Sequence, residues 1–455
     1  MKKSSQKNAI RFIDLFAGIG GFRLGFENAC DALGIKHECV FTSEIKQHAV
    51  AIYQENFSGT ITGDITKVEA HEVPDFDVLL GGFPCQAFSS AGKREGFADT
   101  RGTLFFEIER IIRAKKPKAI ILENVEGLVN HDRLVKSDEI GRTLSTILQS
   151  LKSLNYEVTW AVLNANDFGI PQRRKRIYIV ASLGKEVSLK NFEINHRALE
   201  QILQSGLPPL DSKLAVLLNE NFSPSELYGK AIKDKRGGEG NIHSWDLGLK
   251  GKVSKKQKEL LQRILKARRN KKWAAQKGIE WMDGMPLTID EIQTFFDEPK
   301  LVEMLEDLVE KGYLAYEHPK GLVTSNTDGN VKTYRAPNTD SPKGYNIVSG
   351  KLSFEINMIL DPKGSCPTLV ATDLSRITVC DSQGVRGLTN VELRRLFGFP
   401  DEFKILGKQS EINDVFGNTV VVPVVQAVSE RLIDWIVNKN DHSDSVHFVG
   451  NENIQ

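Results

Sequence analysis

The sequence predicts an α/β fold, in which a doubly wound, Rossmann-like parallel sheet is joined to a second, smaller domain. Short β-rich runs alternate with amphipathic runs from residue 9 to about residue 182, and this alternation is typical of a doubly wound sheet. From about 183 to 365 the alternation is lost, and Gly, Lys and Asn become frequent. We therefore expect a regular domain that is interrupted by a long region of different structure.

Five runs have the composition of strands, and two runs between them have the pattern of helices. The strands are expected at 9–16, 37–44, 77–82, 118–125 and 176–182, and the helices at 103–114 and 141–154. A further helix is expected near the end of the chain, at 429–438. Open α/β sheets bind their ligands at the carboxyl ends of the strands. Functional side chains are therefore expected at these strand ends or close to them.

The second region contains two segments with a readable pattern. The run 254–278 places Leu260, Leu261, Ile264 and Leu265 on one helix face and leaves the other face basic. That face is either a solvated surface or a phosphate contact. Residues 287–335 predict a helix, a break at Pro299, a second helix, a strand and a hairpin near Asp328. That order is typical of a winged helix, although an unspecialised helical insertion has the same elements.

Composition excludes several classes of protein. The net charge of +1 argues against a uniformly basic coat protein for nucleic acid, but it allows a local basic cleft. No apolar run is long enough for a membrane span, and the N-terminus lacks the apolar centre of a signal peptide. The five cysteines show neither a CxxC pair nor metal-ligand spacing, so we expect a cytoplasmic protein without a disulfide framework or a metal site.

The first strand leads into DLFAGIGGFRLG, residues 14–25. A glycine-rich turn between a strand and a helix cradles a nucleotide-like ligand, but a tight turn without a ligand looks the same. Arg23 breaks the dinucleotide fingerprint and disfavours an NAD-dependent oxidoreductase. At the next strand end Glu44 suits the hydroxyls of a ribose. Asp64 suits an exocyclic amine, and Ile65 suits the flank of a purine.

Cys85 lies in GGFPCQAFSS, a turn-like setting for a cysteine. It is either an inert thiol or a nucleophile that the loop presents beside the nucleotide pocket. Glu123, in the run ENV, ends the following strand. A thiolate and a carboxylic acid on adjacent strand ends are able to straddle a planar heterocycle. The arginines of QRRKRIYIV, residues 172–180, suit a phosphate or a ring carbonyl.

In this order, the motifs resemble those of the DNA cytosine-5 methyltransferase family, and in particular its bacterial restriction–modification members. DLFAGIGG resembles the adenosylmethionine loop, GGFPCQAFS the Pro-Cys loop, ENV the glutamate motif and QRRKRIYIV the arginine motif. RGLTNVELRRLFGFPD (386–401) and GNTVVVPVV (417–425) resemble the two motifs that follow the variable target-recognition region. The resemblance covers about 10–182 and 366–436.

The resemblance implies an adenosylmethionine-dependent enzyme with a set of site residues. Cys85 would be the nucleophile and Glu123 the group at N3 and N4 of the pyrimidine, while Arg174 and Arg176 would hold the target nucleotide. S-adenosylmethionine would be bound by Phe16, Gly18, Ile19, Gly21, Glu44, Asp64, Ile65, Pro84, Leu104, Asn418 and Thr419. DNA would be contacted by Gln86, Ser89, Thr368 and Leu369.

Three positions depart from the common family pattern. Ile45 stands where a tryptophan often flanks the adenine, Lys175 where a glutamate often separates the arginines, and Thr419 where serine is common. None of these positions is the cysteine or the glutamate.

The resemblance also implies an organisation of the chain. A catalytic domain would span 1–184, with 411–438 returning to it, and a target-recognition domain would span 185–410 and include the insertion 254–335. Residues 439–455 would form a mobile tail. We expect a monomer that acts on double-stranded DNA, with a cognate restriction endonuclease acting on the same site without a stable complex. Two alternatives stay open: a tRNA cytosine-5 methyltransferase, and a catalytically silent DNA-binding protein on the same scaffold.

Overall fold

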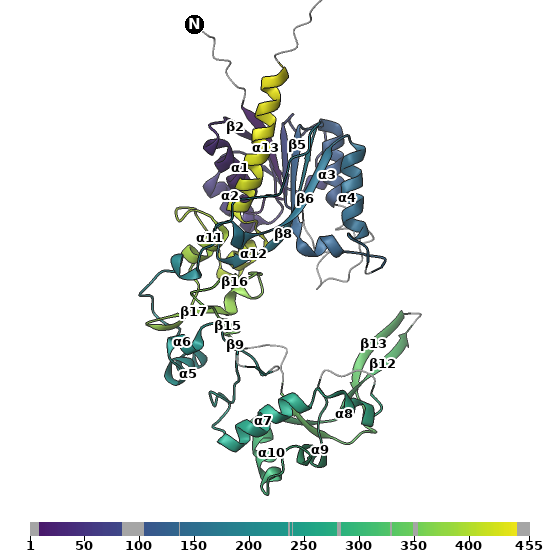
Figure 1. Cartoon of the computed structure of the whole chain (residues 1–455), viewed down its shortest axis with the longest axis vertical. Helices are drawn as coiled ribbons and strands as arrows, with labels where there is room; N and C mark the ends of the chain where they lie inside the picture. The colour runs from purple at the N-terminus through teal and green to yellow at the C-terminus, as the bar shows by residue number, and fades with distance from the viewer. Residues whose placement is uncertain are drawn as a thin grey trace, which may run out of the picture. The chain divides into compact units, whose positions relative to one another are not determined.

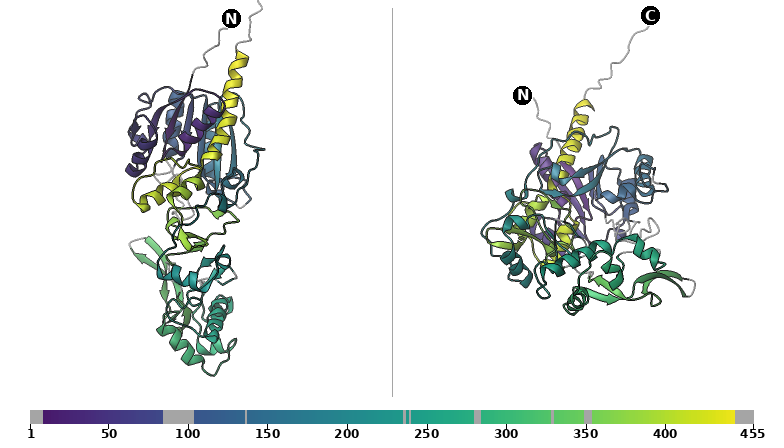
Figure 2. Two further views of the ribbon diagram at one scale, coloured as in Figure 1. Left: turned by 90° about the vertical axis from the view of Figure 1, so that its left-hand side faces the viewer. Right: turned by 60° about the horizontal axis from the view of Figure 1, so that its bottom comes forward.

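The computed structural model describes residues 9–83, 104–135, 137–234, 237–238, 240–279, 284–327, 330–348 and 354–443. The chain divides into two compact units (Figures 1 and 2). The first takes the chain up to Leu203, Pro362–Leu374 and the chain from Thr389, and the second takes Gln204–Asp361 and Ser375–Leu388. Residues 185–203, 362–374 and 389–410, which we expected in the second domain, therefore cluster with the first unit.

The first unit is built on a seven-stranded sheet with the order β3-β2-β1-β4-β5-β8-β6. Its strands are β1 (Ile10–Leu15), β2 (His37–Ser43), β3 (Ile61–Thr62), β4 (Val78–Gly81), β5 (Ala119–Val125), β6 (Glu157–Asn164) and β8 (Lys175–Ser182). The Rossmann-like α/β prediction and its five strands are confirmed. β6 was not predicted, although its alternating run EVTWAVLN would have indicated a strand.

The direction of β8 corrects the expectation of a wholly parallel sheet. β1 to β5 pair in parallel, whereas β8 runs antiparallel to both β5 and β6. The connection from β6 to β8, residues 165–174, is too short for the crossover that parallel strands need. As a result the start of β8 lies at the sheet edge where β5 ends, with Arg176 paired to Val125.

Helices cover both faces of this sheet, because successive residues of a strand point to opposite faces. On one face Phe12 packs against Phe26 of α1 (Gly21–Ala32), with their rings 4.8 Å apart. On the other face Ile13 and Leu15 join a core with α3 (Leu104–Lys115) and α4 (Arg142–Ser153). Further helices of this unit are α2 (Gln47–Asn56), α11 (Asn390–Phe397), α12 (Gln409–Asn418) and α13 (Val422–Ser443).

The last helix, α13, lies beside α1 (Figure 1). A Cβ on Gly25 would come within 2.7 Å of Val425, so glycine permits this close approach. The helix begins well before residue 429, where we expected it, despite the β-branched run VVVPVV. It continues to Ser443, so the expected mobile tail is helical in its first residues, and 444–455 lie outside the described residues.

Short elements complete the first unit and bring distant segments together. β7 (Gln172–Arg173) pairs in parallel with β16 (Cys366–Pro367), which joins the arginine motif to the segment Pro362–Leu374, found in the chain between the two parts of the second unit. The single-turn helices are η1 (Ile65–Lys67), η3 (Glu126–Asn130), η4 (Ala165–Asp167) and η5 (Leu199–Gln201).

The second unit contains two separate hydrophobic cores. One core gathers α5 (Lys213–Asn221), α6 (Pro224–Leu227) and a five-stranded sheet with the order β10-β9-β15-β17-β18. The strands are β9 (Ala231–Ile232), β10 (Asn241–Ile242), β15 (Met358–Ile359), β17 (Ile377–Asp381) and β18 (Gly384–Gly387), and η6 (Leu374–Arg376) precedes β17.

The other core of this unit lies within residues 245–347. Its elements are α7 (Lys255–Ala267), α8 (Lys271–Gln276), α9 (Ile289–Gln293), α10 (Leu301–Glu310), β11 (Leu314–Glu317), β12 (Lys320–Thr327), β13 (Asn330–Pro337) and β14 (Gly344–Ile347). Leu260, Leu261, Ile264 and Leu265 of α7 are buried in it, as predicted. In the described part of the chain no helix has the length and apolarity to cross a membrane.

Candidate active site

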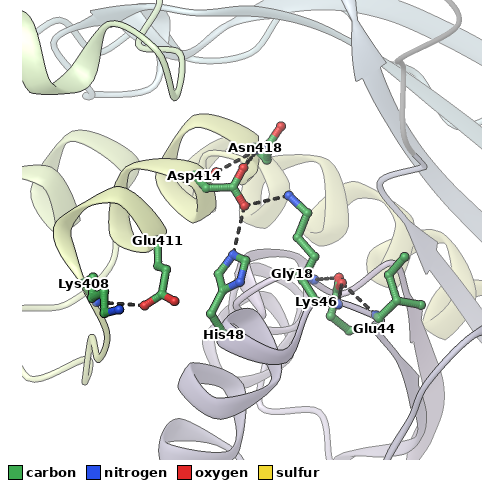
Figure 3. Close-up of polar contacts among 9 residues, drawn as sticks. Gly18, Glu44, Lys46, His48, Lys408, Glu411, Asp414 and Asn418 are labelled. Carbon is green, nitrogen blue, oxygen red and sulfur yellow. Dashed lines mark hydrogen bonds and ion pairs between the residues drawn. The ribbon is translucent and has the colours of Figure 1, made fainter.

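The glycine-rich turn after β1 is held open by left-handed backbone and by one carboxylate. Phe16, Gly18 and Gly20 all have positive φ angles. The Gly18 N–H donates to Oε2 of Glu44 over 2.8 Å (Figure 3). The other Glu44 oxygen accepts from the N–H groups of Ile45 and Lys46, also over 2.8 Å. Glu44 therefore fixes the turn and the end of β2 as one unit.

The end of the sequence returns to the same turn. A Cβ on Gly21 would meet Oγ1 of Thr419 at 2.9 Å and Val420 at 3.0 Å, so the two segments are in close contact. Ile19 is fully buried, and Thr419 is buried as well. The turn and the GNTVVVPVV motif, nearly four hundred residues apart in the chain, thus pack directly against each other.

Asp414 of α12 clasps the loop after β2 (Figure 3). Its Oδ2 accepts from Lys46 Nζ over 2.7 Å and lies 2.9 Å from His48 Nε2. Partial burial opposes the ionisation of Asp414, but the hydrogen bonds from Lys46 and His48 outweigh it and lower its pKa. Asn418 Nδ2 donates to the backbone oxygen and to Oδ1 of the same residue. The clasp was not predicted, because a pairing across 368 residues has no local signal.

The predicted purine-binding residues lie at the next strand end. Asp64 caps η1, where its carboxylate accepts from the N–H and the hydroxyl of Thr66, and these hydrogen bonds lower its pKa. Ile65 is buried, and Leu104 is half-buried at the start of α3. The contacts of these residues with adenine stay predictions.

Asp14 is a buried acid that the sequence did not single out. It lies on β1 directly before the turn and has no accessible surface. Among the described residues neither of its carboxylate oxygens has a hydrogen-bond partner of normal geometry. Burial raises its pKa to about 8, despite the nearby Arg23 guanidinium. The only sequence feature that could have pointed to Asp14 was its position as the first residue of DLFAGIGG.

Glu123 and Arg176 form an ion pair at the end of β5. Arg176 Nε lies 3.0 Å from Glu123 Oε1, and both side chains are largely buried. Burial raises the pKa of Glu123 even though Arg176 and Arg174 act to lower it. A carboxyl group with a raised pKa is suited to donate a proton near neutral pH. The antiparallel direction of β8 is what brings Arg176 to this carboxylate.

The neighbouring loop starts beside this pair. β4 and β5 pair up to Gly81 and Leu122, so the chain leaves β4 next to Glu123. Asn124 Nδ2 donates to the carbonyl of Phe83 over 3.2 Å and anchors that point. Pro84, Cys85, Gln86 and Ser89 lie outside the described residues.

The four described cysteines are poor nucleophiles. Burial raises the pKa of Cys30 and Cys366 to about 12 and that of Cys380 to about 11. It also raises the pKa of Cys39. The thiolate is the reactive form of a cysteine, so these four offer little of it at neutral pH.

Arg174 differs from the role that the motif implied for it. The side chain is buried, and its Nη1 donates to the carbonyl of Leu369 over 2.9 Å. Its Nη2 donates to the carbonyls of Gly417 and Thr419 over 3.1 and 2.8 Å. Burial and the neighbouring Arg176 lower its pKa to about 9. In the described structure Arg174 ties three segments of the first unit together, and its contact with a nucleotide stays a prediction.

The two predicted DNA contacts in the segment Pro362–Leu374 have different surroundings. Leu369 is fully buried, so its side chain is not available to DNA in the described structure, and only its carbonyl and N–H are used. Thr368 is half-buried and donates from its hydroxyl to the carbonyl of Arg173 over 2.7 Å. Within the described ranges no group of three or more His, Cys, Asp or Glu residues is placed to hold a metal ion.

A sheet of this topology, with a glycine-rich first turn and a carboxylate after the second strand, is the fold of adenosylmethionine-dependent methyltransferases. Two solved structures share it. A prophage-encoded DNA modification methyltransferase of E. coli has a TM-score of 0.52 at 20% identity and covers 94% of this chain and 100% of its own. The Entamoeba histolytica methyltransferase EhMeth has a TM-score of 0.53 at 14% identity, with 94% and 99% covered.

Sequence comparison identifies the family. Residues 10–434 match the model of the C-5 cytosine-specific DNA methylase family. The type II methyltransferase M.NlaIV of Neisseria lactamica is 54% identical over 93% of this chain and 99% of its own length. M.BanI of Aneurinibacillus aneurinilyticus is 37% identical over 94% and 97%. The chain therefore belongs to the C-5 cytosine-specific DNA methylase family and is a DNA (cytosine-5-)-methyltransferase, as its motifs predicted.

Proposed function

We propose that this enzyme methylates C5 of a flipped-out cytosine in duplex DNA at a specific site, through a covalent adduct with Cys85. The observation that carries the proposal is the buried Glu123–Arg176 pair, 3.0 Å apart, at the strand end beside which the chain departs toward Cys85. The raised pKa of Glu123 supports its role as an acid, and the raised pKa values of the other four cysteines support Cys85 as the nucleophile.

The residues around the first turn fit S-adenosylmethionine. The hydrogen bond from the Gly18 N–H to Glu44 holds a turn of left-handed backbone beside a carboxylate. Thr419 packs so closely against Gly21 that a Cβ on Gly21 would not fit. In the proposal Glu44 accepts from the ribose hydroxyls, Asp64 and Ile65 bind the adenine, and Leu104, Asn418 and Thr419 line the rest of the pocket with Phe16, Gly18, Ile19, Gly21 and Pro84. When bound, the cofactor supplies an electrophilic methyl group.

Cytosine C5 is a weak nucleophile in its aromatic ring, so the protein must activate it. The Cys85 thiolate donates an electron pair to C6 and forms the S–C6 bond, while the C5–C6 π pair moves to C5. Glu123 donates a proton to N3, which stabilises the resulting enamine. C5 then takes up the methyl group, and the pair of the bond that breaks stays on the sulfur of the cofactor. A solvent water takes the C5 proton, the C5–H pair re-forms the C5–C6 double bond and expels the thiolate from C6, and Glu123 takes back the N3 proton.

The two arginines have separate roles in the proposal. Arg176 contacts the target nucleotide and holds Glu123 in place. Arg174 acts as a positioning residue, because its three carbonyl contacts fix the segments that carry Leu369 and Thr419. Neither face of a cytosine ring is accessible within a duplex, so the base has to leave the stack, at a cost of roughly a few kcal/mol.

The named relatives favour DNA over RNA as the substrate. M.NlaIV and M.BanI are type II methyltransferases and align along nearly their whole length. We infer that the second unit selects the DNA sequence. We also infer that the enzyme acts as a monomer in the cytoplasm and protects host DNA from a restriction endonuclease that need not bind it stably.

The test measures transfer of labelled methyl groups from S-adenosylmethionine to duplex DNA and to transfer RNA. The expected result is transfer to duplex DNA, with bisulfite mapping in an expressing host showing 5-methylcytosine in one sequence context. Equal or preferential transfer to transfer RNA would contradict the DNA assignment. Methylcytosine without a sequence context would contradict site specificity.

A further inference from the structure

The core within residues 245–347 has the element order of a winged helix. α7 and α8 are followed by a β-bridge between Leu287 and Tyr345, then by α9, α10, β11, the β12–β13 hairpin and β14. β14 pairs with both Leu287 and β11, which gives a small antiparallel sheet. In helix-turn-helix proteins the second helix of the motif enters the major groove. Here α10 takes that position in the chain.

α10 is poorly suited to a contact with DNA, because it carries acidic residues and no basic ones. Its sequence, LVEMLEDLVE, has a formal charge of −4 from Glu303, Glu306, Asp307 and Glu310. All four except Asp307 are exposed, and Asp307 is half-buried. Binding to duplex DNA depends on neutralising phosphates with basic side chains. A groove lined with phosphates would repel this helix.

The β12–β13 hairpin has the opposite character. Residues 320–337 contain three basic residues and one acidic residue. Three large apolar side chains are exposed there: 53% for Leu322, 40% for Val323 and 51% for Tyr334. Leu322 pairs with Arg335 and Val323 with Tyr334, so both faces of the ribbon present an apolar side chain to the surface.

The hairpin continues beyond the small sheet as a ribbon of two strands (Figure 1). At its base His318 Nδ1 donates to the Ser341 carbonyl over 2.8 Å, and the Asn338 N–H donates to the Pro319 carbonyl over 2.7 Å. A two-stranded hairpin is at best marginally stable by itself in water. Exposed apolar groups that cluster on such an element, next to basic ones, mark an interaction surface.

We propose that the two strands of the hairpin, 320–327 and 330–337, and not α10, are the part of this module that contacts duplex DNA. The major groove admits a two-stranded ribbon. Lys320, Leu322 and Arg335 lie on one face of the ribbon and Tyr334 on the other, so we expect the ribbon to enter the groove edge-on. Lys320 and Arg335 would contact phosphates on one side, and Leu322 and Tyr334 would contact sugars and base edges on the two sides. The proposal rests on the proposed function, because it takes the duplex substrate of the enzyme as the partner. It adds which surface of the second unit meets that duplex.

Fluorescence anisotropy of the full-length enzyme on a labelled duplex tests this proposal. The duplex is centred on a cytosine that bisulfite mapping shows to be methylated. Arg335→Gln is expected to weaken binding and to lower the slope of log K against log salt by about 1. The double variant Leu322→Ser/Tyr334→Ser is expected to weaken binding about tenfold. Circular dichroism checks that both variants are folded.

A matched double variant on α10 is the control. Val302→Ser/Glu306→Gln removes one exposed apolar side chain, where the hairpin double variant removes two, and it neutralises one exposed carboxylate as Arg335→Gln neutralises one guanidinium. It is expected to bind DNA as the wild type does or more tightly. Weaker binding by the α10 variant together with unchanged binding by the hairpin variants would overturn the proposal.

Hydrogen exchange of the wild-type chain covers the case in which a hairpin variant does not fold. Addition of the duplex is expected to slow exchange in 320–337 and to leave 301–310 unchanged. Protection of 301–310 instead, or protection of 320–337 that depends on protein concentration without DNA, would overturn the proposal. A wild-type enzyme that transfers no methyl group to the duplex would refute the proposed function itself. Active transfer with unaltered hairpin variants would refute only the hairpin contact.

Discussion

Replacement of Arg174 by methionine is expected to destabilise the first unit strongly, because the guanidinium donates hydrogen bonds to three buried backbone carbonyls. It donates over 2.9, 3.1 and 2.8 Å to the carbonyls of Leu369, Gly417 and Thr419. It also lies 5.3 Å from the ring centroid of Phe397. Methionine is two atoms shorter and has no donor, so these carbonyls would lose their partners.

The magnitude follows from the three hydrogen bonds. A hydrogen bond from a charged donor contributes about 1.5–3 kcal/mol, and losses within one network do not add fully. We expect a loss of about 3–5 kcal/mol, as for other broken buried charge networks. For a large domain this corresponds to a fall in melting temperature of at least about 6 °C.

The assay compares Arg174→Met with Arg176→Gln by differential scanning calorimetry and by methyl-transfer kinetics. Arg176 is engaged with Glu123 and with its neighbour Lys175. Its replacement is expected to reduce kcat while the melting temperature changes by less than half as much as in Arg174→Met. A change below about 1 kcal/mol in Arg174→Met would refute the structural role. Equal losses of stability in both variants would refute the division between the two arginines.

Three further changes test the region around the first turn. Asp14→Asn removes a carboxyl whose pKa is about 8 in the folded protein and 3.8 in its ordinary state. Between these values the unfolded chain gives up this proton more readily than the folded one, so the wild type loses stability as the pH rises from about 4 to 8. Urea midpoints are thus expected to show Asp14→Asn gaining on the wild type between pH 4 and 8, by at most about 1.4 kcal/mol per pH unit, and parallel profiles would contradict this. Gly21→Ala places a Cβ 2.9 Å from Thr419 Oγ1, so the KM for S-adenosylmethionine is expected to rise. Gly387→Ala is the control: a Cβ there has open space, and the KM is expected to stay unchanged. Asp414→Asn breaks partly exposed pairs with Lys46 and His48. The KM for S-adenosylmethionine is therefore expected to rise about two- to fivefold at low salt and less at high salt. Glu411→Gln is the matched control, because Glu411 lies on the same helix but accepts a hydrogen bond from Lys408 (Figure 3), and an equal rise in both variants would count against the clasp.

The strands and helices of the first unit could be predicted, because each carries its pattern within a short run of residues. The antiparallel β8 could not, because strand direction depends on the length and path of the connection and not on composition. The run IYIV is apolar whichever way it points. α13 was predicted too short, since its first turns are rich in valine, and its packing against α1 overrides their low helix propensity.

The site shows the same division. Glu44 follows β2 and Glu123 lies near the end of β5, so their place at one sheet edge could be predicted from the alternation of elements. Arg174 and Arg176 could not be separated, because they lie two residues apart in one run and differ only in what the fold places against them. Arg174 is buried against Leu369, Gly417 and Thr419, and only the tertiary structure brings these together. The Asp414 clasp depends in the same way on contacts across most of the chain.

The covalent role of Cys85 is tested most directly with a duplex that carries 5-fluorocytosine at the methylated position. After attack at C6 and methyl uptake at C5, fluorine cannot leave as a proton does, so elimination is blocked and the protein stays bound to the DNA. Intact mass spectrometry is expected to show an adduct of the wild type and none of Cys85→Ser, with peptide mapping placing the DNA on Cys85. An undiminished adduct in Cys85→Ser, or DNA mapped to Cys30, Cys39, Cys366 or Cys380, would contradict the mechanism.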